Sequence, residues 1–165
     1  MNTLTETNQI NVCGDFDIII AGGGIAGISS ALAAARQNKR VLVIENSYIL
    51  GGLATSGLVT IYLPLCDGYG KQVSFGICEE LIRLSVKHCC EDKYCKAWLE
   101  GGSIDEKKAQ RFEVQYNPHL FDMEAEKLLR ENGVKILYGT KICGAKKNGN
   151  RIEYYIIENK NNRLT

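Results

Sequence analysis

A glycine-rich segment with the pattern G-x-G-x-x-G lies between an expected strand and an expected helix. The strand is the apolar, β-branched run 16–21, and the helix is the alanine- and leucine-rich segment 25–37. At such a junction Gly22 permits a tight turn, Gly24 lets the backbone approach a phosphate, and Gly27 lets the helix pack on the strand. The segment therefore predicts a site for the pyrophosphate of a dinucleotide.

The residues that follow extend this expected phosphate site. Ile25, Ala26 and Gly27 open the helix, where unpaired backbone N–H groups and the positive end of the helix dipole attract an anion. A second apolar strand over 40–45 ends in Glu45, about 20 residues after the glycines, where a ribose hydroxyl needs an acceptor. A carboxylate there disfavours a ribose 2′-phosphate, so the pattern favours NAD or FAD over NADP. The alternative is that the glycines serve packing alone and that Glu45 is a solvated carboxylate.

The segment after Glu45 distinguishes NAD from FAD. An NAD-binding domain should continue with another helix and strand, whereas residues 46–59 are punctuated by glycines and lack helical periodicity. The run G-G-L-A-T-S-G-L at 51–58, together with D-G-Y-G-K-Q-V at 67–73 and G-I-C-E-E-L at 76–81, resembles the N-terminal part of one flavoprotein family. This is the FAD-dependent oxidoreductase family related to fumarate reductase flavoproteins, within the two-dinucleotide-binding flavoproteins. The resemblance covers nearly the whole chain.

The resemblance implies an α/β fold of the Rossmann-like FAD/NAD(P)-binding type, with a parallel sheet and a β-meander, and FAD as the cofactor. It implies hydride transfer between flavin and an unknown small-molecule substrate, with the electron acceptor and the catalytic residues left open. The alternatives are a noncatalytic dinucleotide-binding module, an inactive fragment, or an NAD-dependent enzyme. The implied cofactor contacts are Gly22, Gly24, Ile25, Ala26, Gly27, Glu45, Gly51, Gly52, Leu53, Ala54, Thr55, Ser56 and Ile142.

The resemblance also implies a domain organisation. Residues 1–14 are expected to form a tail, and residues 15–165 the N-terminal portion of an FAD-binding domain. Within it, residues 76–116 are either an insertion or the start of a substrate domain. The family's later Gly-Asp segment and most of a substrate domain do not occur in these 165 residues. We therefore expect the chain to be the truncated N-terminal portion of a longer enzyme.

The remaining elements follow from periodicity and from helix and turn signals. The charged stretch 90–110 is expected to be irregular, and Asn117 with Pro118 should start a helix that Gly133 ends. An Asn148–Gly149 turn predicts a hairpin. The expected helices are 76–89 and 120–132, and the expected strands are 134–138, 140–145, 151–157 and the beginning of a third meander strand at 163–165.

Composition narrows the class of protein. A net charge of +1 gives no electrostatic reason to expect nucleic-acid binding, and no apolar stretch is long enough for a membrane span. The polar residues 1–11 do not resemble a signal peptide. We therefore expect a cytoplasmic protein whose seven cysteines are free thiols, with its oligomeric state open.

A metal site is not expected. His88, Cys89 and Cys90 with Cys95 could be proposed as ligands, but C-x2-C pairs and a second ligand cluster are missing. The C-x4-C spacing of Cys90 and Cys95 matches flavin disulfide reductases, yet it lies too far beyond the Gly51–Gly52 pair.

Three further side chains have a chemical and a structural interpretation. Cys66 is either a redox thiol or a small buried residue, and His119 is more simply a surface or cap residue than a base. Arg111 could bind an anionic substrate or be solvated. No nucleophilic triad is visible, so the expected chemistry depends on the cofactor.

Overall fold

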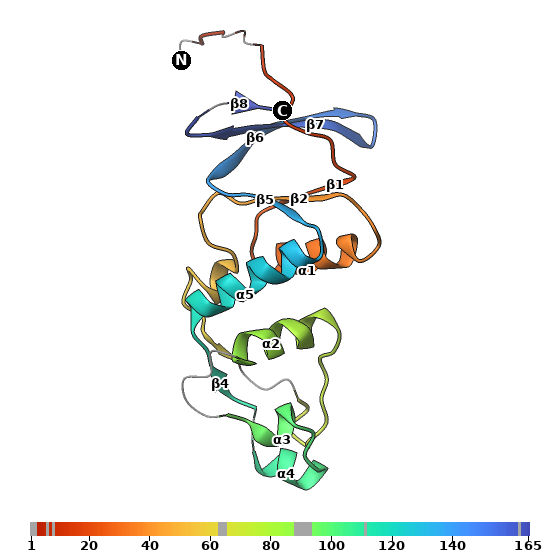
Figure 1. Cartoon of the computed structure of the whole chain (residues 1–165), viewed down its shortest axis with the longest axis vertical. Helices are drawn as coiled ribbons and strands as arrows, with labels where there is room; N and C mark the ends of the chain where they lie inside the picture. The colour runs from red at the N-terminus through yellow and green to blue at the C-terminus, as the bar shows by residue number, and fades with distance from the viewer. Residues whose placement is uncertain are drawn as a thin grey trace.

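A three-stranded parallel sheet crosses the middle of the molecule (Figure 1). The computed structural model describes residues 3–5, 7, 9–62, 66–87, 94–110, 112–161 and 163–165, without the side chain of Tyr62. The strands are β1 (Ile18–Ala21), β2 (Val41–Ile44) and β5 (Lys135–Leu137), with β2 in the centre. All four β2 residues are buried because both faces of the sheet are covered.

The two faces of the sheet are covered by different layers. The helices α1 (Ile25–Ala35) and α5 (Pro118–Glu131) cover one face. The antiparallel meander of β6 (Thr140–Asn148), β7 (Arg151–Asn159) and β8 (Arg163–Leu164) lies over the other. The expected α/β fold with a parallel sheet and a meander is confirmed.

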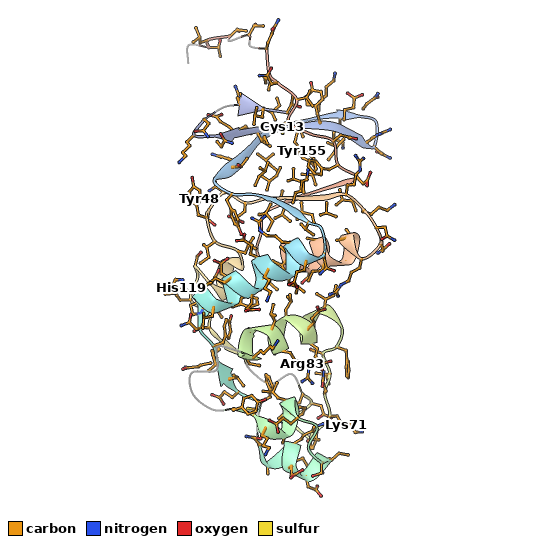
Figure 2. The ribbon with its side chains drawn as sticks, viewed as in Figure 1. Cys13, Tyr48, Lys71, Arg83, His119 and Tyr155 are labelled. Atoms are coloured by element: carbon orange, nitrogen blue, oxygen red, sulfur yellow. The ribbon has the colours of Figure 1, made fainter. Side chains whose placement is uncertain are left out.

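The meander encloses a cleft against the sheet. Ile157 packs with Leu42 and Ile44, and Tyr155 lies between the two layers (Figure 2). Towards β1 the layers separate and leave a cleft of about 1050 Å³, partly lined by Phe16. The apolar contact between meander and sheet is therefore concentrated between β2 and β7.

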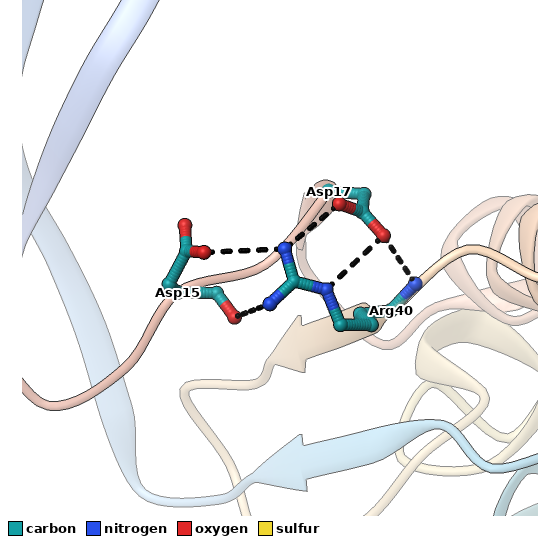
Figure 3. Close-up of polar contacts among 3 residues, drawn as sticks. All are labelled: Asp15, Asp17 and Arg40. Carbon is teal, nitrogen blue, oxygen red and sulfur yellow. Dashed lines mark hydrogen bonds and ion pairs between the residues drawn. The ribbon is translucent and has the colours of Figure 1, made fainter.

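Arg40 joins the beginnings of β1 and β2 (Figure 3). Its guanidinium lies 2.9 Å from a carboxylate oxygen of Asp17 and 3.1 Å from one of Asp15, and its backbone N–H donates to Asp17 at 2.8 Å. Because the strands are parallel, this bridge is at the end opposite the glycine turns.

The N-terminal segment joins the meander. Asn11 pairs with Leu164 in a parallel bridge, and the Asn11 carbonyl accepts from the Thr165 N–H at 3.0 Å. The Cys13 N–H donates to the Thr165 carbonyl at 2.6 Å. Residues 11–13 thus lie alongside β8.

A second helical layer lies beyond α1 and α5 (Figure 1). It contains α2 (Ile77–Lys87), which Glu80 joins to Arg36 at the end of α1 through an ion pair of 2.6 Å. The short strands β3 (Ile61–Tyr62) and β4 (Val114–Gln115) pair beside it. None of the helices in the described ranges is long and apolar enough to cross a bilayer.

The expectation of irregular structure over 90–110 is wrong where the structure describes that stretch, from residue 94 onward. It contains α3 (Lys96–Leu99) and α4 (Ile104–Ala109). Ser103 and Glu106 form a capping box at the start of α4, which satisfies backbone N–H groups of its first turn. The charge pattern of this stretch did not reveal this helix start. Trp98 is buried, and its indole N–H donates to the Gln110 carbonyl at 2.6 Å.

Most other expected elements are confirmed with shifted ends. Asn117 caps α5 and Pro118 opens it, as its sequence signals predicted. The strands β6 and β7 are longer than expected, and Gly149 with Asn150 forms the two-residue turn between them. Local signals placed the elements well, whereas packing decided where each one ended.

Candidate functional site

The first glycine turn, Gly22–Gly24, joins β1 to α1 and leaves an open space above the helix. Gly22 has φ of +99°, a conformation that favours glycine, and its N–H donates to the Ile44 carbonyl at 2.8 Å. A Cβ on Gly27 would collide with the Gly22 carbonyl, so α1 packs directly against the turn. A Cβ on Gly24, by contrast, would meet no atom within 4 Å.

The start of α1 presents backbone donors to this space. Gly24 is the N-cap residue, and no side chain caps the helix. Within the described part of the chain, the N–H groups of Ala26 and Gly27 have no hydrogen-bond acceptor. Free N–H groups and the positive end of an eleven-residue helix fit a phosphate group.

Glu45 follows β2 and lies beside the same turn. One of its carboxylate oxygens accepts the Gly23 N–H at 2.6 Å, and the other accepts the N–H and hydroxyl of Ser47 at 2.7 and 2.8 Å. Burial by itself raises the pKa of Glu45, but these hydrogen bonds outweigh burial and lower the pKa below its usual value. The half-buried Glu45 is therefore an oriented, ionised acceptor.

A second glycine turn lies against the first. Gly51, with φ of +93°, precedes the short helix η1 (Gly52–Ala54), and its N–H donates to the Gly23 carbonyl at 2.8 Å. A Cβ on Gly52 would lie 3.3 Å from the Gly24 Cα atom. Segments almost thirty residues apart along the chain thus form one continuous backbone surface.

The residues after Gly52 divide into exposed and buried ones. The side chains of Leu53 and Ser56 are exposed. Ala54 is buried, and the Tyr116 hydroxyl donates to its carbonyl at 3.0 Å. Thr55 is also buried, and its hydroxyl donates to the Leu50 carbonyl, so this hydroxyl stabilises the turn from inside the protein.

Ile142 lies further from the glycine turns than the other predicted contacts. It is half-buried on β6 and packs against the apolar cluster that includes Ile44 and Ile157. The strand begins beside Glu45, since the Thr140 N–H donates to the Glu45 carbonyl at 3.0 Å. Ile142 therefore lies on the strand adjacent to the site.

The other candidates lie apart from this surface. His119 is exposed at the start of α5, where its backbone N–H donates to the Asn117 side chain at 3.0 Å (Figure 2). Cys66 is half-buried and packs against an apolar cluster around Trp98. These placements match the surface or cap interpretation of His119 and the packing interpretation of Cys66.

Cys95 belongs to the same apolar cluster. It is buried, and its thiol contacts the Glu113 carbonyl at 3.6 Å. His88, Cys89, Cys90 and Arg111 lie outside the described residues. Cys95 thus contributes to the packing of the apolar cluster around Trp98.

Two partly buried polar contacts near the second turn were not predicted. The Tyr116 hydroxyl, which shares its one hydrogen between two carbonyls, also lies 3.1 Å from the Val59 carbonyl, and a carboxylate oxygen of Asp122 accepts the Leu50 N–H at 2.7 Å. Both side chains come from segments more than fifty residues away along the chain. The only available sequence signal was that Asp122 is a polar residue beside the apolar face of the expected helix 120–132.

Comparisons with known proteins bear on the fold and the family of this chain. Thioredoxin reductase of Ureaplasma parvum is 28% identical over 71 residues, which are 43% of this chain and 23% of that protein. A myxobacterial chondrochloren halogenase is similar in structure, with a TM-score of 0.59, 18% identity, and coverage of 90% of this chain and 34% of that one. The geranylgeranyl bacteriochlorophyll reductase-like protein of Thermoplasma acidophilum has a TM-score of 0.56 at 16% identity, with coverage of 94% and 37%.

These structures share the fold, and the chain spans well under half the length of each named relative. The sequence model described as FAD dependent oxidoreductase matches residues 17–165, which is nearly the whole chain. The chain therefore belongs to the FAD dependent oxidoreductase family.

Proposed function

We propose that this chain binds the ADP portion of FAD and forms the cofactor-binding part of a flavin-dependent oxidoreductase. The observation that carries the proposal is the open space above Gly24, bordered by free N–H groups of α1 and by the ionised Glu45. An anion at a helix start and a hydroxyl donor near a carboxylate are the two chemical groups that ADP offers.

Each part of the surface has a role in this proposal. The N–H groups at Ile25–Gly27 receive the pyrophosphate, and Glu45 accepts a hydroxyl of the adenosine ribose. The Gly51–Gly52 turn lets the cofactor approach closely, with the exposed Leu53 and Ser56 continuing the surface and Ile142 contributing from β6. The buried Ala54 and Thr55 support this surface from inside the protein. FAD, when bound, supplies the redox chemistry, and the chain binds and orients it.

The substrate in this proposal is a small molecule that exchanges a hydride with the flavin. The family match supports that reaction class, while no described side chain is assigned as a catalytic acid or base. We place the protein in the cytoplasm, because the described cysteines Cys13, Cys66, Cys78, Cys95 and Cys143 are all free thiols. A noncatalytic dinucleotide-binding module is the competing function.

Calorimetric titration with ADP, FAD, 5′-AMP and 2′,5′-ADP tests the binding proposal. We expect ADP and FAD to bind. We expect 2′,5′-ADP to bind more weakly than 5′-AMP, which has the same single 5′-phosphate, because the 2′-phosphate meets the Glu45 carboxylate. Failure of both ADP and FAD to bind would contradict the proposal. Flavin reduction by candidate substrates then separates an oxidoreductase from a noncatalytic module.

A further inference from the structure

Leu50, the residue before the Gly51–Gly52 turn, has both of its backbone polar groups bound by side chains. Its N–H donates to Asp122 of α5 at 2.7 Å, and its carbonyl accepts from the Thr55 hydroxyl. Its side chain is completely buried. The position and orientation of this residue are therefore fixed from both sides.

Leu50 also contacts the first glycine turn. A Cβ on Gly23 would lie 2.5 Å from a methyl carbon of Leu50, so the leucine side chain packs directly beneath Gly23. The next residue, Gly51, donates its N–H to the Gly23 carbonyl. Any shift of Leu50 would consequently change how the two glycine turns meet.

Asp122 contacts Leu50 from a different part of the fold. It lies 72 residues from Leu50 in sequence, on a helix that packs on the sheet. Burial raises the pKa of its carboxyl, the nearby Glu126 raises it further, and the Leu50 N–H opposes both effects. A half-buried carboxylate is costly unless it is hydrogen-bonded, and the Leu50 N–H is its hydrogen-bond donor.

We propose that Asp122 is a positioning residue for dinucleotide binding, because its hydrogen bond to Leu50 sets the Gly51–Gly52 turn against the phosphate turn. Among the described residues, Asp122 is hydrogen-bonded to neither glycine turn and acts through Leu50. This inference rests on the proposed binding of the ADP portion of FAD. It adds α5 to the elements that shape the cofactor surface.

The test compares Asp122→Ala, Asp122→Asn and the matched control Glu124→Ala. Glu124 lies on the same helix and has no hydrogen bond or ion pair among the described residues. The measurements are the dissociation constant of ADP, hydrogen exchange of the amides of residues 50–58 without ligand, and the thermal unfolding midpoint. Together they separate local loosening of the turn from global unfolding.

We expect Asp122→Ala to raise the ADP dissociation constant about tenfold, as loss of a charge-assisted hydrogen bond does. Exchange over residues 50–58 should accelerate more than exchange in β2. Asp122→Asn retains an oxygen acceptor and should restore most of the affinity, and Glu124→Ala should resemble the parent. If Asp122→Ala does not fold, the Asn variant still has to bind ADP for the proposal to stand.

Two results would overturn the assignment. Parent-like affinity and exchange in Asp122→Ala would show that the contact does not position the turn. Equal loss of affinity in the Ala and Asn variants, in step with their unfolding midpoints, would show a purely structural role. If the parent protein binds neither ADP nor FAD, the proposed function itself fails, which is a different outcome.

Discussion

Gly24, the N-cap residue of α1, and Gly27, in the first turn of that helix, lack a side chain for opposite physical reasons. The missing side chain of Gly24 leaves an open space, whereas that of Gly27 permits direct contact between α1 and the Gly22 carbonyl. Gly24 also has φ of −68°, which any residue can adopt. Substitutions at the two positions should therefore separate binding from folding.

We expect Gly24→Val to abolish ADP and FAD binding while the protein stays folded. The branched side chain would project into the space that a pyrophosphate needs, where an added Cβ meets no protein atom within 4 Å. Calorimetry measures the affinity, and circular dichroism measures the fold. Gly27→Ala is the contrasting variant, and it should lower the unfolding midpoint because its methyl group collides with backbone. Unchanged affinity in Gly24→Val would show that the turn serves packing only.

Glu45→Ala should weaken FAD or ADP binding by about tenfold to a hundredfold. Loss of a charge-assisted hydrogen bond to the ribose costs about 1.5 to 3 kcal/mol. Fluorescence titration measures the affinity, with Glu153→Ala on the distant β7 as a control. A variant that binds as well as the parent would remove Glu45 from the site.

Glu45 also makes stability depend on pH. The folded-state pKa lies below the ordinary value of 4.5, so the stabilisation is present above pH 4.5 and is lost as the pH falls through the folded pKa. The parent should lose unfolding free energy below pH 4.5 more steeply than Glu45→Gln, measured by urea denaturation without ligand. Parallel pH profiles would show that its hydrogen bonds contribute little.

At the scale of elements, polar side chains fix where strands and helices start. Arg40 joins the starts of β1 and β2 (Figure 3). Asn117 satisfies the first N–H groups of α5. These contacts are partly exposed, so their effects on stability should be modest. Each contact can nevertheless be removed by a single substitution, and its effect on stability can be measured separately.

Asp17→Asn should remove part of the acid sensitivity of the parent. Hydrogen bonds from Arg40 lower the pKa of Asp17 to about 2, below its ordinary value of 3.8. The stabilisation is therefore present above pH 3.8 and is lost as the pH falls towards 2. The difference in unfolding midpoint between parent and variant should shrink over that interval and shrink with added salt. A difference independent of both pH and salt would contradict an ionic role.

Asn117→Ala should destabilise the protein by about 0.5 to 2 kcal/mol. The Asn117 side chain accepts the N–H groups of His119 and Leu120 at 3.0 and 3.2 Å, and loss of an N-cap typically has this cost. Urea denaturation measures the effect, and Asn117→Asp should retain most of the stability. Equal losses in the two variants would mean that another contact of Asn117 dominates.

At the scale of the whole molecule, residues 11–13 and Thr165 meet at the meander, and the described residues before them extend away from it (Figure 1). Residues 11–13 lie against β8, outside the part that the family model covers. The assignment of residues 1–14 to a separate tail remains a prediction, but Asn11 and Cys13 take part in backbone pairing.

Deletion of residues 1–13 should lower the unfolding free energy by about 1 to 3 kcal/mol, as two lost backbone hydrogen bonds suggest. Deletion of residues 1–7 is the matched control and should change little, because the pairing begins at Asn11. Urea denaturation compares both with the parent. Equal stability of all three proteins would show that the pairing contributes nothing.

The sequence by itself determined most of the strands and helices and the two glycine turns, and its resemblance to the flavoprotein family implied the parallel sheet and the meander. The elements follow from local signals, since apolar runs, glycines and an Asn-Pro cap act within a few residues of themselves. The proximity of Glu45 to the first turn was equally predictable, because strands of a parallel sheet end at the same edge. Hence the sequence could predict that Glu45 lies beside the first glycine turn.

Only the tertiary structure decided which side chains support that surface. The contacts of Asp122 with Leu50 and of Tyr116 with Ala54 join residues 72 and 62 positions apart, and nothing local marks either pair. Thr55 illustrates the same limit, since sequence assigned it to the cofactor and the fold buries its hydroxyl on Leu50. Burial and long-range pairing arise when distant segments pack together, and therefore the roles of these polar groups are fixed only in the folded chain.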